Sequence, residues 1–352
     1  MSEQMHREIT EIINKSTDKP TIVNENSNFV VITYWWGRGR LNRNTARPCT
    51  SFYEDYLKDC NKTMLNLLHT IVTKHKSEEG QDAELDIILE GTKEELDQTE
   101  NTQPAIFLVG FSIFQLIKKE FAIDLNNANY FAGHSLGEYT ALSCSGALSF
   151  SDTLKLLRVR GKAMQEAVPK GEGGMIAILG STTEIIEKIF EENKNNYECY
   201  IANDNSNGQI VVSGKLINLD LLIEDLKKRS IKNIKLPVSA PFHCKLMNNA
   251  TKIMQDEIQK YDFKKLKNTL ISNVTAQEVN EISILKELLI KQIESRVRWR
   301  ESVNLMLEKK ITQFIEIGPG KVLSGLIKRI DRKAKVTSIN TEDDIKQINL
   351  ND

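Results

Sequence analysis

Apolar and polar positions along the chain predict strands and helices that follow one another. Residues 29–33 read FVVIT, a short apolar run rich in β-branched side chains, which indicates a buried strand. Residues 104–121 open with a proline and are apolar nearly all round, which is typical of a buried helix. A strand at 129–132 then runs through a glycine into a helix at 136–144, and an amphipathic helix is expected over 152–168.

Residues 174–237 show a separate pattern of apolar runs. Their apolar runs predict the order strand, helix, strand, strand, helix, strand, which is the order of a ferredoxin-like unit. Beyond this unit the alternation resumes, with helices at 244–259, 284–293 and 322–330 and strands at 270–273 and 314–317. Strands that alternate with helices on both sides of the unit favour an α/β fold, with a mostly parallel sheet and helices on both faces.

These patterns divide the chain into four parts. A polar arm at 1–28 precedes a discontinuous α/β domain, which consists of residues 29–168 and 238–340. The ferredoxin-like subdomain is expected at 169–237, inserted into that domain, and residues 341–352 form a tail.

Composition excludes several classes of protein. Of 352 residues, 40% are hydrophobic and 27% are charged, so the chain is expected to bury a core rather than stay disordered. Its 47 basic and 48 acidic side chains give a net charge of −1, which offers no argument for nucleic-acid binding. No apolar run is long enough to cross a membrane, and the first residues lack the apolar core of a secretory signal. Five scattered cysteines without a CxxC pair, and the absence of HExxH, argue against disulfide and metal sites, so we expect a metal-free protein of the cytoplasm.

The pentapeptide 133–137, Gly-His-Ser-Leu-Gly, matches the GxSxG pattern between a predicted strand and a predicted helix. A serine on such a sharp turn is held in the open, and the flanking glycines avoid Cβ clashes. The main-chain N–H of Leu136, at the start of the helix, is placed to donate to a developing oxyanion. Ser135 is therefore the predicted nucleophile, and the alternative is an ordinary tight turn.

A serine nucleophile requires a base, and the chain contains five histidines. His6 lies in the polar arm, His69 and His75 lie in or beside an exposed helical stretch, and His134 stands on the wrong side of the turn. His243 lies where the chain returns from the inserted subdomain, at the mouth of an expected cleft, and is the predicted base.

A third catalytic residue is not evident in the sequence. Hydrolases with this turn place an acid between the serine and the histidine. In this interval most candidates fall in the inserted subdomain, as Asp204, Asp220 and Asp225 do. We therefore expect a Ser–His dyad whose histidine is oriented by a main-chain carbonyl.

Several separate motifs together resemble the family of malonyl-CoA:acyl-carrier-protein transacylases. The resemblance runs from about residue 29 to 340 and keeps the family's order. The matching segments are FAGHSLGEY at 131–139 with AL at 141–142, RGKAMQ at 160–165, APFH at 240–243, EIGPGK at 316–321, TQPA at 102–105 and NSNGQ at 205–209. The resemblance implies an α/β-hydrolase-like core with a ferredoxin-like insert, in agreement with the pattern of elements.

The resemblance also implies malonyl transfer through an acyl-serine intermediate. Ser135 would attack the thioester of malonyl-CoA, His243 would take its proton, and the phosphopantetheine thiol of an acyl carrier protein would then receive the malonyl group. Arg160 would hold the malonyl carboxylate in a bidentate pair, and the main chain of the loop 316–321 would support the histidine. Phe242, directly before the histidine, matches the malonyl-type rather than the methylmalonyl-type pattern.

Other residues of these motifs are implied to bind the substrate: Gln103, Met164 and Asn205. Coenzyme A and the carrier's phosphopantetheine act as substrates, so no cofactor is expected. We expect a monomer that binds neither nucleic acid nor membrane. Acyl carrier proteins are usually acidic, so basic side chains near the cleft would steer them. The candidates close to the C-terminal motif are Arg296, Arg298, Arg300, Lys321, Lys328 and Arg329.

One segment departs from the family's pattern. The family opens with a strand followed by Gly-Gln-Gly-Ser-Gln, whereas residues 35–40 read Trp-Trp-Gly-Arg-Gly-Arg. Arg38 takes the place of the glutamine whose region supplies the second oxyanion donor, and its main-chain N–H is expected to keep that role. Its guanidinium could stabilise the oxyanion, bind the malonyl carboxylate or a coenzyme A phosphate, or crowd the acyl pocket and change the substrate.

Two other functions are open at this point. An acyl hydrolase of the same family, which clears acyl groups from carrier proteins, would use the same serine and histidine. A catalytically silent docking subunit would need neither. Arg160 favours the transferase because a carboxylate clamp has no use for plain acyl groups, whereas the altered loop at 37–39 keeps the hydrolase open.

Overall fold

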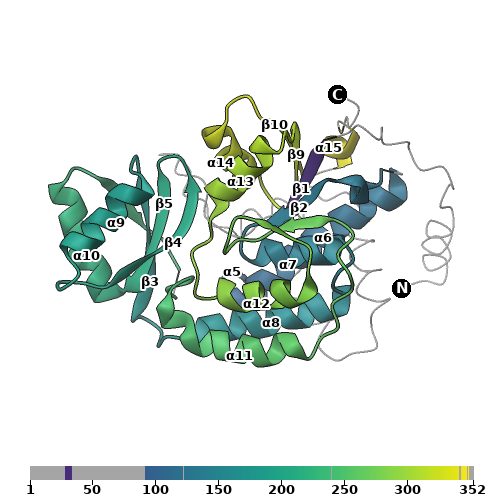
Figure 1. Ribbon diagram of the computed structural model, residues 1–352. Helices are drawn as coiled ribbons and strands as arrows, with labels where there is room; N and C mark the ends of the chain where they lie inside the picture. Colours follow the sequence, from purple (N-terminus) through teal and green to yellow (C-terminus); the bar gives the residue numbers. More distant parts are fainter. Residues whose placement is uncertain are drawn as a thin grey trace.

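Two sheets organise the residues that the computed structural model describes, which are 28–33, 92–121, 123–238, 240–340, 342–346 and 348 (Figure 1). In these residues the larger sheet has the strand order β10-β9-β1-β2-β7-β8, and neighbouring strands run parallel except β7 and β8. Its strands are β1 (Phe29–Thr33), β2 (Tyr130–Gly133), β7 (Thr269–Ile271), β8 (Glu278–Val279), β9 (Gln313–Ile317) and β10 (Lys335–Ile339). The predicted α/β fold with a mostly parallel sheet is therefore confirmed.

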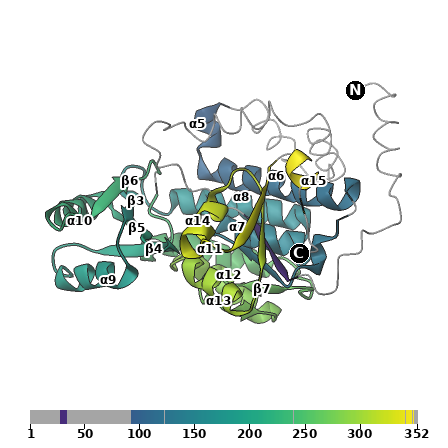
Figure 2. The same ribbon diagram turned by 90° about the horizontal axis from the view of Figure 1, so that it is seen from above.

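Helices cover both faces of the larger sheet, because its strands send alternate apolar side chains into two cores. In β1, Phe29 and Val31 enter one core, whereas Val30 and Ile32 enter the other. Figure 1 shows α13 and α14 on the opposite side of the sheet from α8 and α11, and in Figure 2, which is seen from above, α13 and α14 overlap α11 and α12 in projection. The first core is shared with α6 (Thr99–Glu120), α7 (Leu136–Cys144), α8 (Phe150–Glu166), α11 (Asn248–Gln259) and α12 (Ile282–Gln292). The second is shared with α13 (Trp299–Glu308) and α14 (Val322–Ile330).

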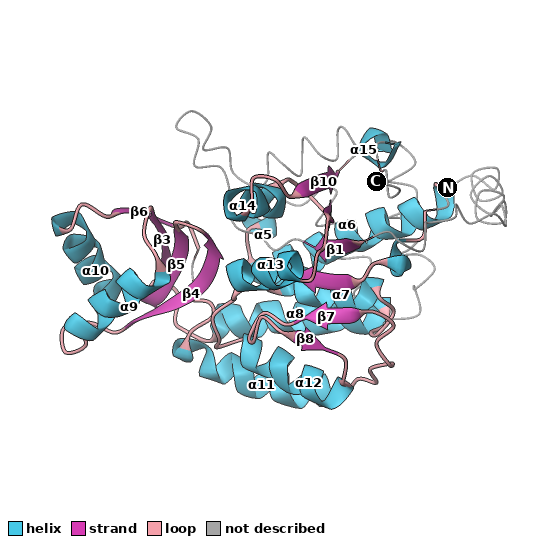
Figure 3. Cartoon of the chain, turned by 45° about the horizontal axis from the view of Figure 1, so that its top comes forward, coloured by secondary structure: helices cyan, strands magenta, loops and turns pink. Residues whose placement is uncertain are grey.

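The smaller sheet has the strand order β4-β5-β3-β6, and all its pairs are antiparallel. With two helices it forms the predicted β-α-β-β-α-β order, and Figure 3 shows both helices on the outer side of this sheet, away from the larger one. Its own apolar core includes Ile176, Ile186 and Leu222. The elements are β3 (Gly173–Leu179), α9 (Thr183–Glu192), β4 (Cys199–Ser206), β5 (Gln209–Lys215), α10 (Leu216–Lys228) and β6 (Lys232–Lys235).

The long helix α6 begins at Thr99, five residues before the proline at which the sequence predicted its start. Pro104 has no N–H, so the carbonyl of Glu100 loses its helical donor. That carbonyl instead accepts a hydrogen bond of 3.2 Å from Arg158 Nη1 on α8. A partner distant in sequence thus makes a proline tolerable inside this helix.

Several elements differ from the sequence pattern. The helix predicted at 244–259 begins only at Asn248, after the 3₁₀ turn η2 (Lys245–Met247). The pattern did not predict α13, β8 or β10. It also did not predict the tail helix α15 (Glu342–Lys346), whose Ile345 packs into the first core. The remaining elements are α5 (Lys93–Leu96) and the 3₁₀ turn η1 (Leu125–Asn127).

The parallel strands bring several chain ends to one edge of the larger sheet. Thr33, the last residue of β1, lies level with Gly133 at the end of β2 and with Ile317 at the end of β9. The turn after β2 and the segment after β7 therefore emerge side by side, and both carry polar side chains. Among the described helices, none has the length and apolar character needed to span a bilayer.

Candidate active site

Ser135 occupies a strained turn between β2 and α7. Its φ of 55° lies in the left-handed region, which is unfavourable for a residue with a side chain. A Cβ on Gly133 would lie 2.1 Å from the carbonyl carbon of Gly137, so the chain can turn this sharply only with glycine there. Thr33 Oγ1 donates to the carbonyl of Gly137 at 2.6 Å and ties the turn to the end of β1. This geometry is that of the predicted strand-turn-helix nucleophile.

The structure brings Ser135 and His243 together from positions 108 residues apart. Ser135 Oγ lies 2.8 Å from His243 Nε2, and His243 Nδ1 lies 2.8 Å from the carbonyl oxygen of Gln292. Because a carbonyl only accepts, Nδ1 carries the proton and Nε2 presents its lone pair to the serine hydroxyl. Burial, reinforced by the charge of Arg160, lowers the pKa of His243 to about 3, so the ring is neutral at pH 7. A neutral histidine that presents its lone pair to a hydroxyl can act as a general base.

The main-chain carbonyl expected beside the histidine is present, but it does not come from the loop 316–321. Gln292, at the end of α12, supplies it. The Glu316 carboxylate instead accepts hydrogen bonds from the N–H groups of Leu323 and Ser324, at 3.0 and 2.8 Å. It therefore caps the first turn of α14, since these N–H groups have no acceptor within the helix.

Arg160 is completely buried beside the nucleophile, and its exposed fraction is 0%. Its Nη2 donates to Ser135 Oγ at 3.0 Å and to Gln292 Oε1 at 2.9 Å, and its Nη1 donates to Gln103 Oε1 at 2.5 Å. Its guanidinium carbon lies 5.4 Å from the centre of the Tyr139 ring. The oxygens that it contacts are uncharged, so the cation remains able to attract an anionic ligand.

Two amide side chains in the site were not predicted from the sequence. Asn273 Oδ1 accepts from the Ser135 N–H at 2.6 Å, and its Nδ2 donates to the Gly133 carbonyl at 2.6 Å, so it clamps the turn. Its position at the end of the strand predicted at 270–273 was a usable signal. Gln292 offered none, because a single glutamine near the end of an amphipathic helix resembles an ordinary surface residue.

The other predicted site residues are buried, and each contacts a neighbouring group of the protein. Met164 Sδ lies 4.0 Å from Gln103 Nε2, next to the arginine. The carbonyl of Phe242 accepts from Ser213 Oγ at 2.6 Å. Asn205 Oδ1 lies 2.8 Å from His134 Nε2, so this amide holds the histidine that precedes the nucleophile.

The structure describes one of the two predicted oxyanion donors. Leu136 is the first residue of α7, as expected. Arg38 lies outside the described residues, as do His6, His69 and His75.

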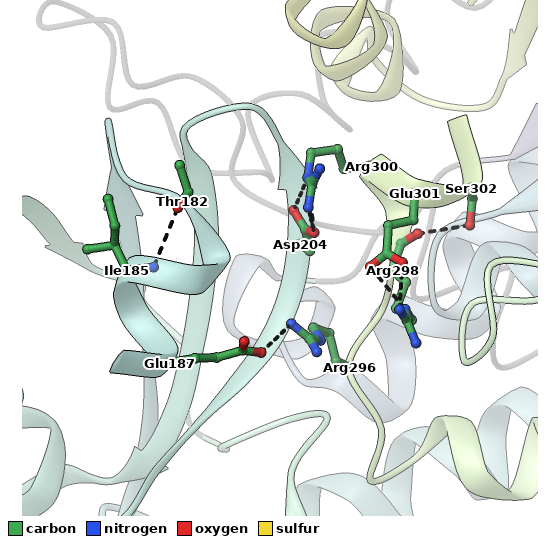
Figure 4. A network of polar contacts seen from close by, with 9 residues as sticks. All are labelled: Thr182, Ile185, Glu187, Asp204, Arg296, Arg298, Arg300, Glu301 and Ser302. Carbon is green, nitrogen blue, oxygen red and sulfur yellow. Dashed lines mark hydrogen bonds and ion pairs between the residues drawn. The ribbon is translucent and has the colours of Figure 1, made fainter. Parts of the chain in front are cut away.

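The six basic residues proposed to steer a carrier protein separate into two groups. Arg296 pairs with Glu187 at 3.0 Å, Arg298 pairs with Glu301, and Arg300 binds the buried Asp204 at 2.7 Å, as Figure 4 shows. These three arginines are ion-pair partners within the fold, which corrects that part of the expectation. The second group lies at and along α14, and no carboxylate among the described residues pairs with its members: Lys321, Lys328 and Arg329.

The geometry places a neutral base, His243, and a buried cation, Arg160, within hydrogen-bond distance of the hydroxyl oxygen of Ser135. Such a set can form a covalent ester on the serine while it holds a negatively charged group of the same substrate. The chemistry that it supports best is acyl transfer with a short acyl group that carries a carboxylate.

Comparisons with known proteins agree with this chemistry. Residues 75–344 match the model of the acyl transferase domain. The chain is 40% identical over 261 residues to the malonyl CoA-acyl carrier protein transacylase of Bacillus subtilis (strain 168), which covers 74% of this chain and 81% of the relative. It superimposes with a TM-score of 0.78 on the acyl-carrier-protein-S-malonyltransferase from Bartonella henselae, at 32% identity, covering 91% of this chain and 97% of the other. A type II PKS acyl-carrier protein in complex with its malonyl-transacylase gives a TM-score of 0.78 at 28% identity, covering 91% and 98%.

Proposed function

The chain belongs to the acyl transferase family, among the malonyl CoA-acyl carrier protein transacylases, and from that premise we propose that Ser135 and His243 carry out its malonyl transfer. The activity is that of an [acyl-carrier-protein] S-malonyltransferase, and its substrates are malonyl-CoA and an acyl carrier protein. Malonyl units are building blocks of fatty-acid and polyketide synthesis, where the product is used.

Two half-reactions use the same pair of residues. Ser135 Oγ attacks the thioester carbonyl of malonyl-CoA while His243 Nε2 takes the hydroxyl proton, and the C–S bond breaks as that proton passes to the coenzyme A thiolate. The thiol of the carrier's phosphopantetheine then attacks the malonyl ester. His243 takes the thiol proton and returns it to Ser135 Oγ as the ester C–O bond breaks. The Leu136 N–H at the start of α7 is proposed to donate to the oxyanion in both steps.

The observation that carries this proposal is the contact between Arg160 and the nucleophile. Arg160 Nη2 lies 3.0 Å from Ser135 Oγ. In a malonyl ester only three covalent bonds separate that oxygen from the free carboxylate carbon, so the guanidinium and the carboxylate meet when the acyl group is this short. An acetyl group would leave the buried cation without an anion, which favours malonyl over plain acyl groups.

The mode of carrier binding is a further part of the proposal. Lys328 and Arg329 are exposed on α14. This helix packs against β4 of the smaller sheet, and Arg329 Nη1 contacts Gln209 of β5 in the same sheet. This basic surface at the junction of the two sheets would attract an acidic carrier protein.

We also propose that the enzyme acts as a monomer in the cytoplasm. The large apolar side chains exposed among the described residues are spread over four helices, α9 to α12.

Intact-protein mass spectrometry tests the proposal directly. The enzyme is mixed with malonyl-CoA or acetyl-CoA and then with a holo carrier protein. We expect a malonyl adduct that moves to the carrier, little acetyl adduct, and no adduct on Ser135→Ala. The control is Ser143→Ala on the same helix, whose hydroxyl has no hydrogen-bond partner among the described residues, and it should label normally. Labelled Ser135→Ala would overturn the nucleophile, and hydrolysis of an acyl carrier would indicate an editing enzyme instead.

A further inference from the structure

Ser135, His243 and Arg160 all contact one buried residue, Gln292. Its main-chain oxygen accepts from His243 Nδ1 at 2.8 Å. Its side-chain Oε1 accepts from Arg160 Nη2 at 2.9 Å, and its Nε2 donates to the carbonyl of Ser135 at 3.0 Å. A displacement of this one residue would disturb the base, the cation and the turn together.

One carboxylate holds this amide. Glu138 on α7 is 1% exposed, and its Oε2 accepts from Gln292 Nε2 at 2.6 Å and from the N–H of Asn273 at 3.4 Å. A carboxylate accepts hydrogen bonds and a guanidinium only donates them. The amide between Glu138 and Arg160 therefore has one favourable orientation, with its oxygen towards Arg160 and its nitrogen towards Glu138.

We propose that Glu138 is a positioning residue of the transfer reaction, because it fixes the Gln292 amide and with it the carbonyl that orients His243. In a Ser-His-Asp triad the acid contacts the imidazole directly. Here the acid acts through one intervening residue, Gln292, so a carboxylate supports the dyad indirectly. This inference rests on the proposed roles of Ser135 and His243.

The ionisation of Glu138 provides a readout. Burial raises the pKa of Glu138 to about 7, and the hydrogen bonds from Gln292 and Asn273 and the charge of Arg160 on α8 oppose that rise. The other titratable side chain coupled to it is Tyr139, its neighbour on α7, whose pKa burial raises to about 12. Protonated Glu138 gains a donor, and the Gln292 amide then loses its single orientation. Activity should therefore fall as the pH drops through about 7, a range in which His243 stays neutral.

The first test is malonyl transfer by Glu138→Gln, measured from pH 5.5 to 8.5. We expect kcat to fall by about tenfold to a hundredfold, which is less than the loss of the base itself would cost. We also expect the decline of kcat as the pH falls through about 7 to disappear in this variant. The control is Glu316→Gln, which alters an equally buried carboxylate on β9 that caps α14, and this variant should keep the decline of kcat. Wild-type kcat in Glu138→Gln, or an unchanged decline, would overturn the inference.

A double-mutant cycle separates positioning from a general structural effect. If Glu138 acts only through Gln292, adding Glu138→Gln to Gln292→Met should cause no further loss of kcat. Additive losses would contradict the inference. Gln292→Met also serves if Glu138→Gln does not fold, because it removes the same link and should also lose the decline near pH 7. Failure of the proposed function would show differently, as wild-type enzyme that forms no malonyl adduct.

Discussion

At the scale of single residues, the site holds its histidines in the neutral form. His134 is buried with its Nε2 2.8 Å from Asn205 Oδ1 and its ring centre 5.8 Å from that of Trp299. Burial lowers the pKa of His134 to about 4 and that of His243 to about 3. Among the described residues, Arg160 is therefore the fixed positive charge beside the serine at neutral pH, and it is the group proposed to select an anionic acyl chain.

The lowered pKa of His134 predicts a stability that depends on pH. An unfolded histidine binds its proton near pH 6.5, whereas the folded one resists protonation until about pH 4. The stabilising contribution is therefore complete above pH 6.5 and is lost as the pH falls towards 4. His134→Gln keeps a donor for Asn205 but cannot titrate. Between pH 7.5 and 5.5, we expect urea unfolding to show wild type losing about 1 kcal/mol more than this variant. Equal losses would mean that the pKa of His134 is the same in the folded and unfolded states.

At the scale of helices and strands, the sequence pattern predicted the elements that are specified by residues close together in the chain. The glycines and the apolar spacing around Ser135 placed β2, the turn and α7 within a residue of their observed bounds. Helix α13 was missed although its buried side chains Trp299, Val303 and Met306 stand at helical spacing. The contact of Arg300 with Asp204, which lies 96 positions earlier, could not be read from spacing. Gln292 was missed for the same reason, since its partners come from α7, α8 and the segment before α11. Contacts between distant segments cannot be read from a periodicity.

Gly161 shows how helix packing sets the position of the arginine. A Cβ at this position of α8 would lie 2.5 Å from the carbonyl oxygen of Thr99 and 2.6 Å from Glu100 Cα. Gly161→Ala should therefore push α8 away from α6 and separate Arg160 from Gln103. We expect a loss of about 1–3 kcal/mol in unfolding free energy and a higher KM for malonyl-CoA. Gly325→Ala, at a helical glycine with nothing within 4 Å, should be neutral or stabilising. Normal KM in Gly161→Ala would show that the helices absorb the methyl group without moving the arginine.

At the scale of the whole molecule, the segment that leads from α12 into α13 joins the two sheets. Asn203 of β4 forms a parallel bridge with Val297, and the N–H of Asp204 donates to the Val297 carbonyl at 2.9 Å. Arg300 then binds the Asp204 carboxylate through two nitrogens, and the next residue is Asn205, which holds His134. The smaller sheet is thereby attached to the larger one beside the nucleophile.

The ion pairs at this junction are predicted to contribute unequally. Asp204 is fully buried, so Arg300→Met leaves an uncompensated carboxylate inside the protein and should cost about 3–5 kcal/mol of unfolding free energy. Asp204→Asn should cost less, because the Arg300 side chain that it leaves behind is 25% exposed and can be hydrated. Glu187→Gln breaks the exposed pair with Arg296 and should cost no more than about 1 kcal/mol. Urea unfolding of the three variants measures this order, and malonyl transfer should fall with Arg300→Met as Asn205 shifts from His134. If Glu187→Gln were as costly as Arg300→Met, burial would not determine how much these ion pairs contribute.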